Sequence, residues 1–160
     1  SGEQLRNACD LAEERNLYRP QVEQPQYSLV ARTRLEDDVR PAAIERGMGL
    51  VIWSPLGSGV LTGKYDAGIP EDSRLGREEW LREAFLSDEF TGRNQRFRAL
   101  SERIGVSRTR LAISWAARGE GISSVILGAS SVEQLQENLA SLEFSLDEET
   151  RREMETIFPK

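Results

Sequence analysis

The most constraining feature of the sequence is a short apolar run, Leu50–Trp53, that ends in a loop of glycine, serine and threonine residues with one lysine, Lys64. A continuous apolar run of this length, stopped by Pro55, is typical of a parallel strand covered on both faces. In the loop, glycines let backbone amides approach a ligand, hydroxyls donate hydrogen bonds, and the lysine adds positive charge. The spacing is not that of a Walker loop, because Tyr65 follows the lysine. Taken alone, the segment fits an anion site and an ordinary glycine-rich connection about equally well.

A second segment repeats this order of elements. The apolar strand expected at Val125–Leu127 leads through small residues into a helix that Ser131 is expected to cap, with Gln134 completing a capping box. Free amides at the start of such a helix favour anions. Gln134, Glu137 and Asn138 share one polar face of this helix, which on spacing alone is explained by solvation. The buried face is expected to consist of Leu135, Leu139 and Leu142.

Helices and strands alternate along the rest of the chain, with no low-complexity tract. This alternation predicts an α/β fold with parallel strands and right-handed crossovers. A long polar excursion is expected between the second strand and the helices that follow it. The predicted helices cover residues 3–16, 35–46, 89–104, 107–117 and 147–157, besides the one near Ser131; the predicted strands lie within 21–28, 50–53 and 125–127, and the excursion covers 68–88.

Composition excludes several classes of function. The net charge of −6 argues against general binding to nucleic acid or to an anionic membrane surface. No histidine is present, so no imidazole acts as acid, base or metal ligand. Cys9, the single cysteine, falls on a helical pattern and is expected to be buried. The acidic runs 36–38 and 147–149 open predicted helices, so we interpret them as stabilisers of the first turn and expect no metal site. No signal peptide or membrane-spanning run is apparent, and a cytoplasmic location is expected.

Together the two segments resemble the aldo-keto reductases, closest to the branch that includes the potassium-channel β subunits. The resemblance runs from Ser1 to about Phe158 and implies the C-terminal half of a (β/α)8 TIM barrel, with parallel strands and outer helices, as a single partial domain over residues 1–160. The motifs that carry it are Trp53-Ser-Pro-Leu-Gly-Ser-Gly, Thr62-Gly-Lys-Tyr, Gly68-Ile-Pro, Ser73-Arg74, Gly128-Ala-Ser-Ser-Val-Glu-Gln-Leu-Gln-Glu-Asn138 and Val22-Glu-Gln-Pro-Gln-Tyr-Ser-Leu-Val-Ala-Arg32.

The resemblance further implies that this half binds NADP(H). It assigns Gln24 to the nicotinamide carboxamide, which a planar amide is suited to recognise because it both donates and accepts. An indole such as that of Trp53 most often packs in a core, but the resemblance places it beside the cofactor. The segment along the nicotinamide and pyrophosphate would comprise Trp53, Ser54, Pro55, Leu56, Ser58 and Gly59. The loop over the phosphates would supply Lys64, Ser73 and Arg74, and the phosphate and adenine side Gly128, Ser130, Gln134, Glu137 and Asn138.

The resemblance implies an oxidoreductase that reduces an aldehyde or ketone by hydride transfer from NADPH. Two cations, Lys64 and Arg74, favour NADP over NAD. The family's catalytic tetrad of Asp, Tyr, Lys and His belongs to the other half of the barrel, so this chain alone is expected to have almost no activity. Two alternatives stay open: a non-catalytic nucleotide-binding or interaction module of the channel-β-subunit type, and a half-barrel that pairs with the absent half or with a second copy.

Overall fold

The computed structural model describes residues 1–85 and 87–160, which group into two compact units. The first unit contains residues 1–55, 116–127 and Lys160, and the second contains residues 56–115 and 128–159. The assignment of all 160 residues to one domain stays a prediction.

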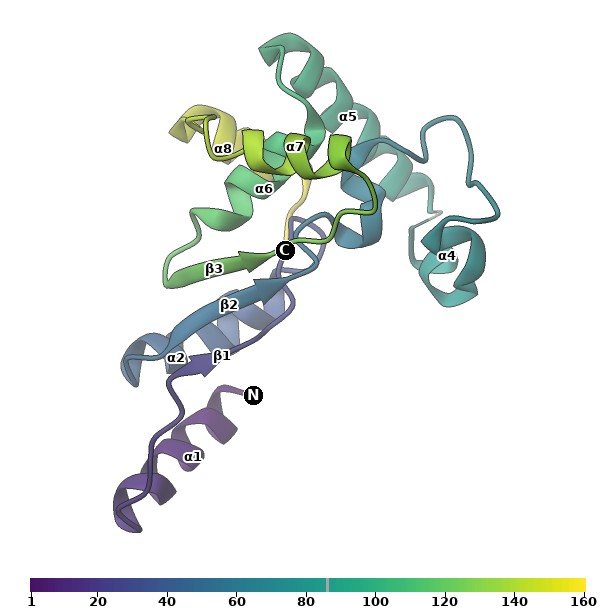
Figure 1. Ribbon diagram of the computed structural model, residues 1–160. Helices are drawn as coiled ribbons and strands as arrows, with labels where there is room; N and C mark the ends of the chain where they lie inside the picture. Colours follow the sequence, from purple (N-terminus) through teal and green to yellow (C-terminus); the bar gives the residue numbers. More distant parts are fainter. Residues whose placement is uncertain (86) are drawn as a thin grey trace. The chain divides into compact units, whose positions relative to one another are not determined.

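A three-stranded parallel sheet forms the centre of the first unit (Figure 1). Its strands are β1 (Val22–Glu23), β2 (Gly49–Trp53) and β3 (Ile122–Ile126), in the order β1-β2-β3. Val22 pairs with Gly49, and Trp53 pairs with Ile126, so the carboxyl ends of β2 and β3 lie side by side. Parallel pairing and the α/β class are therefore confirmed.

Three helical segments belong to the first unit: α1 (Gly2–Glu14), the π-helical turn η1 (Leu35–Val39) and α2 (Arg40–Glu45). Ser1 and Gln4 form a capping box at the start of α1. The helix predicted over 35–46 begins as a π-turn, and Pro41 gives a reason, because it has no N–H to donate to the carbonyl four residues earlier. Cys9 is fully buried, as predicted. The core of this unit also contains Ala12, Leu35, Val39, Ala42, Ala43, Leu50 and Ile52.

The first strand is much shorter than the predicted segment 21–28. Regular pairing stops after Glu23, and Pro25 explains why, because it has no N–H to continue a ladder. Its carbonyl still accepts a hydrogen bond from Trp53 N at 3.1 Å. An isolated parallel bridge then joins Gln26 to Trp53, so the chain continues alongside β2 without regular strand geometry.

Helices dominate the second unit, and five of them begin after a residue whose side chain caps their free amides. Ser73, Ser87, Ser107, Ser131 and Asp147 cap α3, α5, α6, α7 and α8. Phe97 of α5 is fully buried and meets the Phe158 ring edge to face at a centroid distance of 5.4 Å. Among the described helices, none has the length and apolar character needed to cross a membrane. The helices are η2 (Gly57–Thr62), α3 (Arg74–Arg77), α4 (Glu79–Phe85), α5 (Asp88–Ile104), α6 (Arg108–Ala117, its last two residues in the first unit), α7 (Val132–Ala140) and α8 (Glu148–Ile157).

The buried face of α7 differs from the sequence prediction. Leu135, Leu139 and Leu142 are 49%, 52% and 75% exposed, whereas Asn138 is 4% exposed. The Asn138 side-chain amide donates to the Gly128 carbonyl at 3.3 Å, and this bond draws the polar side chain inward. The amphipathic pattern is real, but its apolar face is open within this unit.

Behind the sheet, the first unit holds a charged cluster around Glu36. Arg32 and Glu36 are each 9% exposed in their side chains and form a bidentate pair at 3.1 and 3.2 Å. Tyr27 donates its hydroxyl to Glu36 Oε1 at 2.8 Å, and Lys160 Nζ lies 3.0 Å from Oε2. Burial opposes ionisation of Glu36, but the bonds from Arg32, Lys160 and Tyr27 outweigh it and hold the pKa of Glu36 below its ordinary value. Glu36 lies in the first turn of η1, as the sequence predicted, and is in addition a buried structural carboxylate.

A Glu36→Gln variant is expected to lose about 2 kcal/mol of unfolding free energy at neutral pH, because it removes hydrogen bonds to a charged acceptor. Since the pKa of Glu36 is lower in the folded state, its contribution is present above the unfolded value near 4.3 and disappears as the pH falls through the folded pKa. Urea unfolding of both proteins from pH 7 to pH 3 measures this directly. The difference between them should shrink below about pH 4; a constant difference would contradict the account.

Candidate functional site

In the first unit, the structure brings Gln24 and Trp53 together at the carboxyl ends of β1 and β2. Pro25 O accepts from Trp53 N, and Tyr27 N donates to Trp53 O at 3.2 Å, so the residues after β1 follow the end of β2. Gln24 is exposed, and Trp53 is 41% exposed, which does not fit core packing. The carboxyl edge of a parallel sheet is where ligands bind in this class of fold.

The backbone changes direction sharply after β2. Ser54 has φ 57°, and Ser58 has φ 58°, in the left-handed region that serine rarely adopts. Pro55 between them is buried and Leu56 is half-buried. Non-glycine residues in this region cost energy and cluster where a loop is shaped for function. Ser54 in the first unit and Ser58 in the second therefore each form a local left-handed turn.

The loop of the second unit folds Lys64 back over its own glycines. A Cβ on Gly59 would lie 2.7 Å from Lys64 Nζ, so a larger residue there would require the lysine side chain to move, and the φ of 93° also favours glycine. Lys64 Nζ also lies 4.8 Å from the centre of the Tyr65 ring. Thr62 fixes the turn by donating to Gly59 O at 2.8 Å while it accepts from Lys64 N at 3.3 Å. Lys64 is exposed and forms no ion pair with any residue that the structure describes.

Ser73 and Arg74 begin the short helix α3. Ser73 accepts from Gly76 N at 3.1 Å and donates to Pro70 O at 2.6 Å, so its hydroxyl holds the turn together. Arg74 follows at the first helical position and is exposed. Within residues 1–85 and 87–160, its guanidinium makes no ion pair or side-chain hydrogen bond. Ser73 thus positions the segment and leaves Arg74 available to an anion.

At the start of α7, the residues predicted for the phosphate and adenine side are brought together. Ser131 caps the helix through Gln134 N at 3.2 Å, as predicted. The reciprocal bond of a capping box is displaced by one residue, because Gln134 Oε1 accepts from Ser130 N at 2.9 Å and from Ser130 Oγ at 3.1 Å. Gly128 lies in the open, and a Cβ there would meet nothing within 4 Å. The loop 128–131 is therefore fixed by its own polar groups.

Glu137 is not the solvated carboxylate that spacing suggested. Ser107 donates its hydroxyl to Oε1, and Arg110 donates to Oε2 through Nε at 3.1 Å and Nη2 at 2.9 Å. The hydrogen bond from Ser107 lowers the pKa of Glu137; burial opposes it and Arg110 adds to it. Ser107 also caps α6 by accepting from Arg110 N at 3.2 Å. Glu137 therefore stays ionised and oriented.

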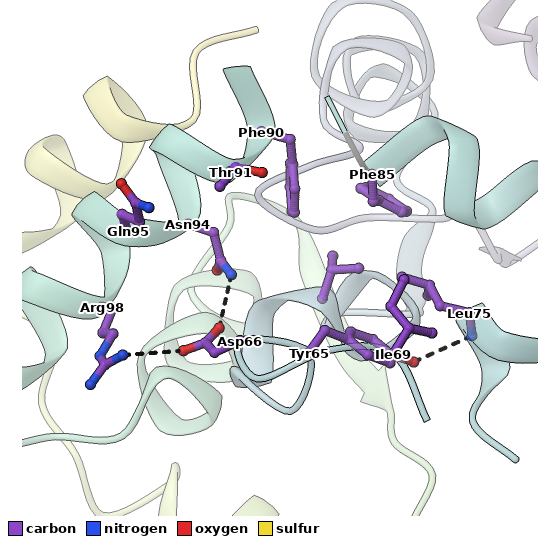
Figure 2. A pocket seen from close by; sticks show the side chains of 11 residues that line it. Tyr65, Asp66, Ile69, Leu75, Phe85, Phe90, Thr91, Asn94, Gln95 and Arg98 are labelled. Atoms are coloured by element: carbon purple, nitrogen blue, oxygen red, sulfur yellow. Dashed lines mark hydrogen bonds and ion pairs between the residues drawn. The ribbon is translucent and has the colours of Figure 1, made fainter. Parts of the chain in front are cut away.

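Residues 57–66 of the second unit form what we call the lysine loop. A cavity of about 220 Å³ lies beside this loop in the same unit (Figure 2). Its walls are mainly apolar, with Phe85 and Phe90 stacked at a tilt 5.0 Å apart. At the polar end, Asp66 accepts from Asn94 at 3.1 Å and is paired with Arg108. None of the predicted cofactor residues lines it. Its lining is Val60, Tyr65, Asp66, Ile69, Leu75, Phe85, Phe90, Thr91, Asn94, Gln95 and Arg98.

Comparison with known proteins decides the family. The model of the aldo/keto reductase family matches residues 1–158. The chain belongs to this family. The resemblance drawn from the motifs is confirmed. A curated relative, described as a probable voltage-gated potassium channel subunit beta from Arabidopsis thaliana, is 39% identical over 146 residues. That match covers 89% of this chain and 44% of the relative, so the chain spans less than half of the relative's length.

Two arginines of this aldo/keto reductase chain were missed by sequence reasoning. Arg108, whose side chain is 10% exposed, pairs with Asp66 and also donates to Asn94 Oδ1 at 3.2 Å, which ties the loop to α5 and α6. Arg110 holds Glu137. Charged partners 27 and 42 residues apart leave no periodic signal in the sequence. Among the described residues, no group of three or more His, Cys, Asp or Glu side chains is arranged to hold a metal.

Gly63→Ala tests how closely the lysine loop is built. Gly63 has φ 88°, and a Cβ there would overlap the Arg108 guanidinium. Alanine should therefore strain the backbone and push Arg108 away from Asp66, at a cost of about 1–3 kcal/mol. Gly68→Ala is the matched control, since Gly68 also has positive φ (128°) but open space around it. Equal losses of stability in the two variants, measured by urea unfolding, would show that backbone strain alone is responsible.

Proposed function

We propose that the intact protein is an NADP(H)-dependent oxidoreductase that reduces an aldehyde or ketone, and that this chain binds the cofactor. NADPH supplies the hydride in such a reaction. The residues of this chain bind and orient the cofactor. A cytoplasmic location and a small carbonyl substrate, without nucleic acid or membrane as partner, are parts of the same proposal.

The observation that carries the proposal is the position of Lys64 and Arg74: both cations are exposed, form no ion pair among the described residues, and follow turns that glycine or serine residues hold. Most arginines of the second unit are bound to carboxylates, among them Arg108 and Arg110. Exposed cations next to glycine-rich turns suit a ligand with phosphate groups, since Arg binds phosphate in a bidentate manner and Lys acts as a point charge. The phosphorylated dinucleotide NADP fits this donor set better than NAD.

The fit extends to the other predicted residues. The amide of Gln24 suits the nicotinamide carboxamide, and the exposed indole of Trp53 suits its ring. The turn from Ser54 through Pro55, Leu56 and Ser58 to Gly59 would run along the pyrophosphate. Ser73 would hold Arg74 in place over the phosphates. On the adenosine side the cofactor would be contacted by Gly128, Ser130, Gln134 and Glu137. Asn138 would contribute by holding the Gly128 carbonyl in place.

We place the catalytic groups and the remaining strands in another part of the intact protein, so that this chain forms the C-terminal half of a (β/α)8 barrel. Three observations support this. The chain contains no histidine. The sheet has two unpaired edges, β1 and β3. The apolar face of α7 is open, as it would be if another segment, or a second copy of the half-barrel, covered it in the assembled protein.

The similarity to a probable potassium channel subunit beta favours a second candidate, a nucleotide-binding subunit that acts through a partner and not through turnover. Both candidates require cofactor binding. They differ in whether bound NADPH is consumed when a carbonyl compound is added.

Thermal unfolding with and without NADPH tests the proposal, followed by an assay of NADPH consumption with a generic aldehyde. A ligand that binds only the folded state at 100 times its Kd stabilises the protein by about 2.7 kcal/mol. Stabilisation by NADPH beyond that by NADH, without consumption by this chain, is expected. No stabilisation by either nucleotide would contradict a cofactor-binding role, and rapid turnover would contradict placing the catalytic groups elsewhere.

A further inference from the structure

The Ser107, Arg110 and Glu137 cluster joins the start of α6 to α7 through three side-chain hydrogen bonds. Arg110 donates twice to one oxygen of Glu137, and Ser107 donates to the other. The Ser107 oxygen in turn accepts from Arg110 N, so its orientation is fixed by the start of α6. The cluster lies in the same unit as Ser130, Gln134, Lys64 and Arg74.

The Glu137 carboxylate retains a free hydrogen-bond acceptor site. A carboxylate has about four lone-pair sites. Arg110 occupies both on Oε2, and Ser107 occupies one on Oε1. About one acceptor site on Oε1 is left, which suffices for a single donor such as an adenine amino group. The side chains of Glu137 and Arg110 are 32% and 41% exposed, so a ligand has access to both.

Charge gives the cluster a second consequence. NADP carries an additional phosphate on the adenosine ribose, with a charge of about −1.5 to −2 at neutral pH. An unbalanced carboxylate close to the adenine would repel that phosphate more than it would repel NAD, which lacks it. Arg110 cancels this charge while leaving Glu137 an acceptor.

We propose that Arg110 is a positioning residue for the adenosine end of NADP: it orients Glu137 toward the adenine and balances its charge, so that the chain accepts the phosphorylated cofactor. This rests on the proposed function. A purely structural pair that ties α6 to α7 would affect stability alone and would not distinguish the two cofactors.

Four variants separate these interpretations: Arg110→Gln, Glu137→Gln, the double variant, and Arg96→Gln as control. Arg96 lies exposed on α5 and makes no ion pair with the described residues. Calorimetric titration with NADPH and NADH gives the ratio of the two Kd values, and thermal unfolding without cofactor reports any structural loss. Arg110→Gln should shift the ratio against NADPH by about tenfold. The double variant, with neither charge, should return it to within about threefold of the wild type.

An unchanged ratio in Arg110→Gln would overturn the proposal and leave a structural pair. A double variant as poor in NADPH binding as Arg110→Gln would also overturn it, because Arg110 would then contact the phosphate itself. If the wild-type chain binds neither nucleotide, the proposed function fails and the inference with it. Preference for NADPH in the wild type, lost in Arg110→Gln but not in Arg96→Gln, is the expected result.

Discussion

Replacing Lys64 and Arg74 together by alanine is expected to weaken NADPH binding by about 10²- to 10⁴-fold. Each side chain would lose a charge-assisted bond to phosphate worth roughly 1.5–3 kcal/mol, and each tenfold change in Kd corresponds to about 1.4 kcal/mol. Both residues are exposed and form no ion pair with the described residues, so the folded chain should tolerate the change. Calorimetric titration of the variant measures the loss.

Arg77→Ala is the matched control for this variant. Arg77 lies on the same short helix α3 as Arg74, is exposed, and has no ion pair within the described residues. If NADPH were attracted only by general positive charge, Arg77→Ala would weaken NADPH binding nearly as much as Arg74→Ala. This non-specific attraction would also vanish at high salt. A specific site predicts a change of less than about threefold for the control. A double variant that binds NADPH normally would remove both residues from the site.

Phe97→Ala is expected to destabilise the second unit by about 3–5 kcal/mol. Phe97 is fully buried on α5, and its ring meets the Phe158 ring nearly at a right angle, 84°. Truncation therefore removes a large buried apolar surface and an aromatic pair, and leaves a cavity between α5 and the end of α8. Because this unit holds the lysine loop and α7, NADPH binding should be lost at temperatures where the unit has unfolded.

Phe97→Leu distinguishes lost packing from a direct effect on the site. Leucine retains most of the apolar volume, so a cost of less than about 1.5 kcal/mol is expected. In both variants, NADPH affinity measured well below the unfolding temperature should equal that of the wild type. A change in affinity without a change in unfolding would mean that Phe97 influences the site by another route.

The sequence contained enough to predict the parallel α/β order, because β2 is a short apolar run and each cap residue stands directly before its helix. Ser131 caps its helix as predicted, and Ser107 and Asp147 also cap the helices that follow them, since a cap depends on contacts within four residues. The predicted length of β1 was too long, although Pro25 in the sequence already indicated that regular strand pairing would stop there. The helices α3 and α4 within the polar excursion were missed because their few apolar residues show no period.

Features that depend on tertiary contacts could not be predicted from the sequence. The leucines of α7 have helical spacing, but spacing does not say which face a neighbouring element covers, and Asn138 is drawn inward by the Gly128 carbonyl. Glu36 and Glu137 were interpreted as helix-opening or solvated charges, whereas Arg32 and Arg110 bind them. The candidate cofactor residues followed from family motifs, since no local rule identifies Gln24 or Arg74 as a ligand.

Calorimetric titration of the chain with NADPH, beside NADH under the same buffer and salt, tests the central claim most directly. The account predicts saturable binding with one NADPH per chain and a weaker response to NADH, since only NADPH engages the cations beside the lysine loop through its additional phosphate. Equal affinity for the two nucleotides, or no binding of either, would contradict the assignment of this chain as the NADP-binding part of a reductase.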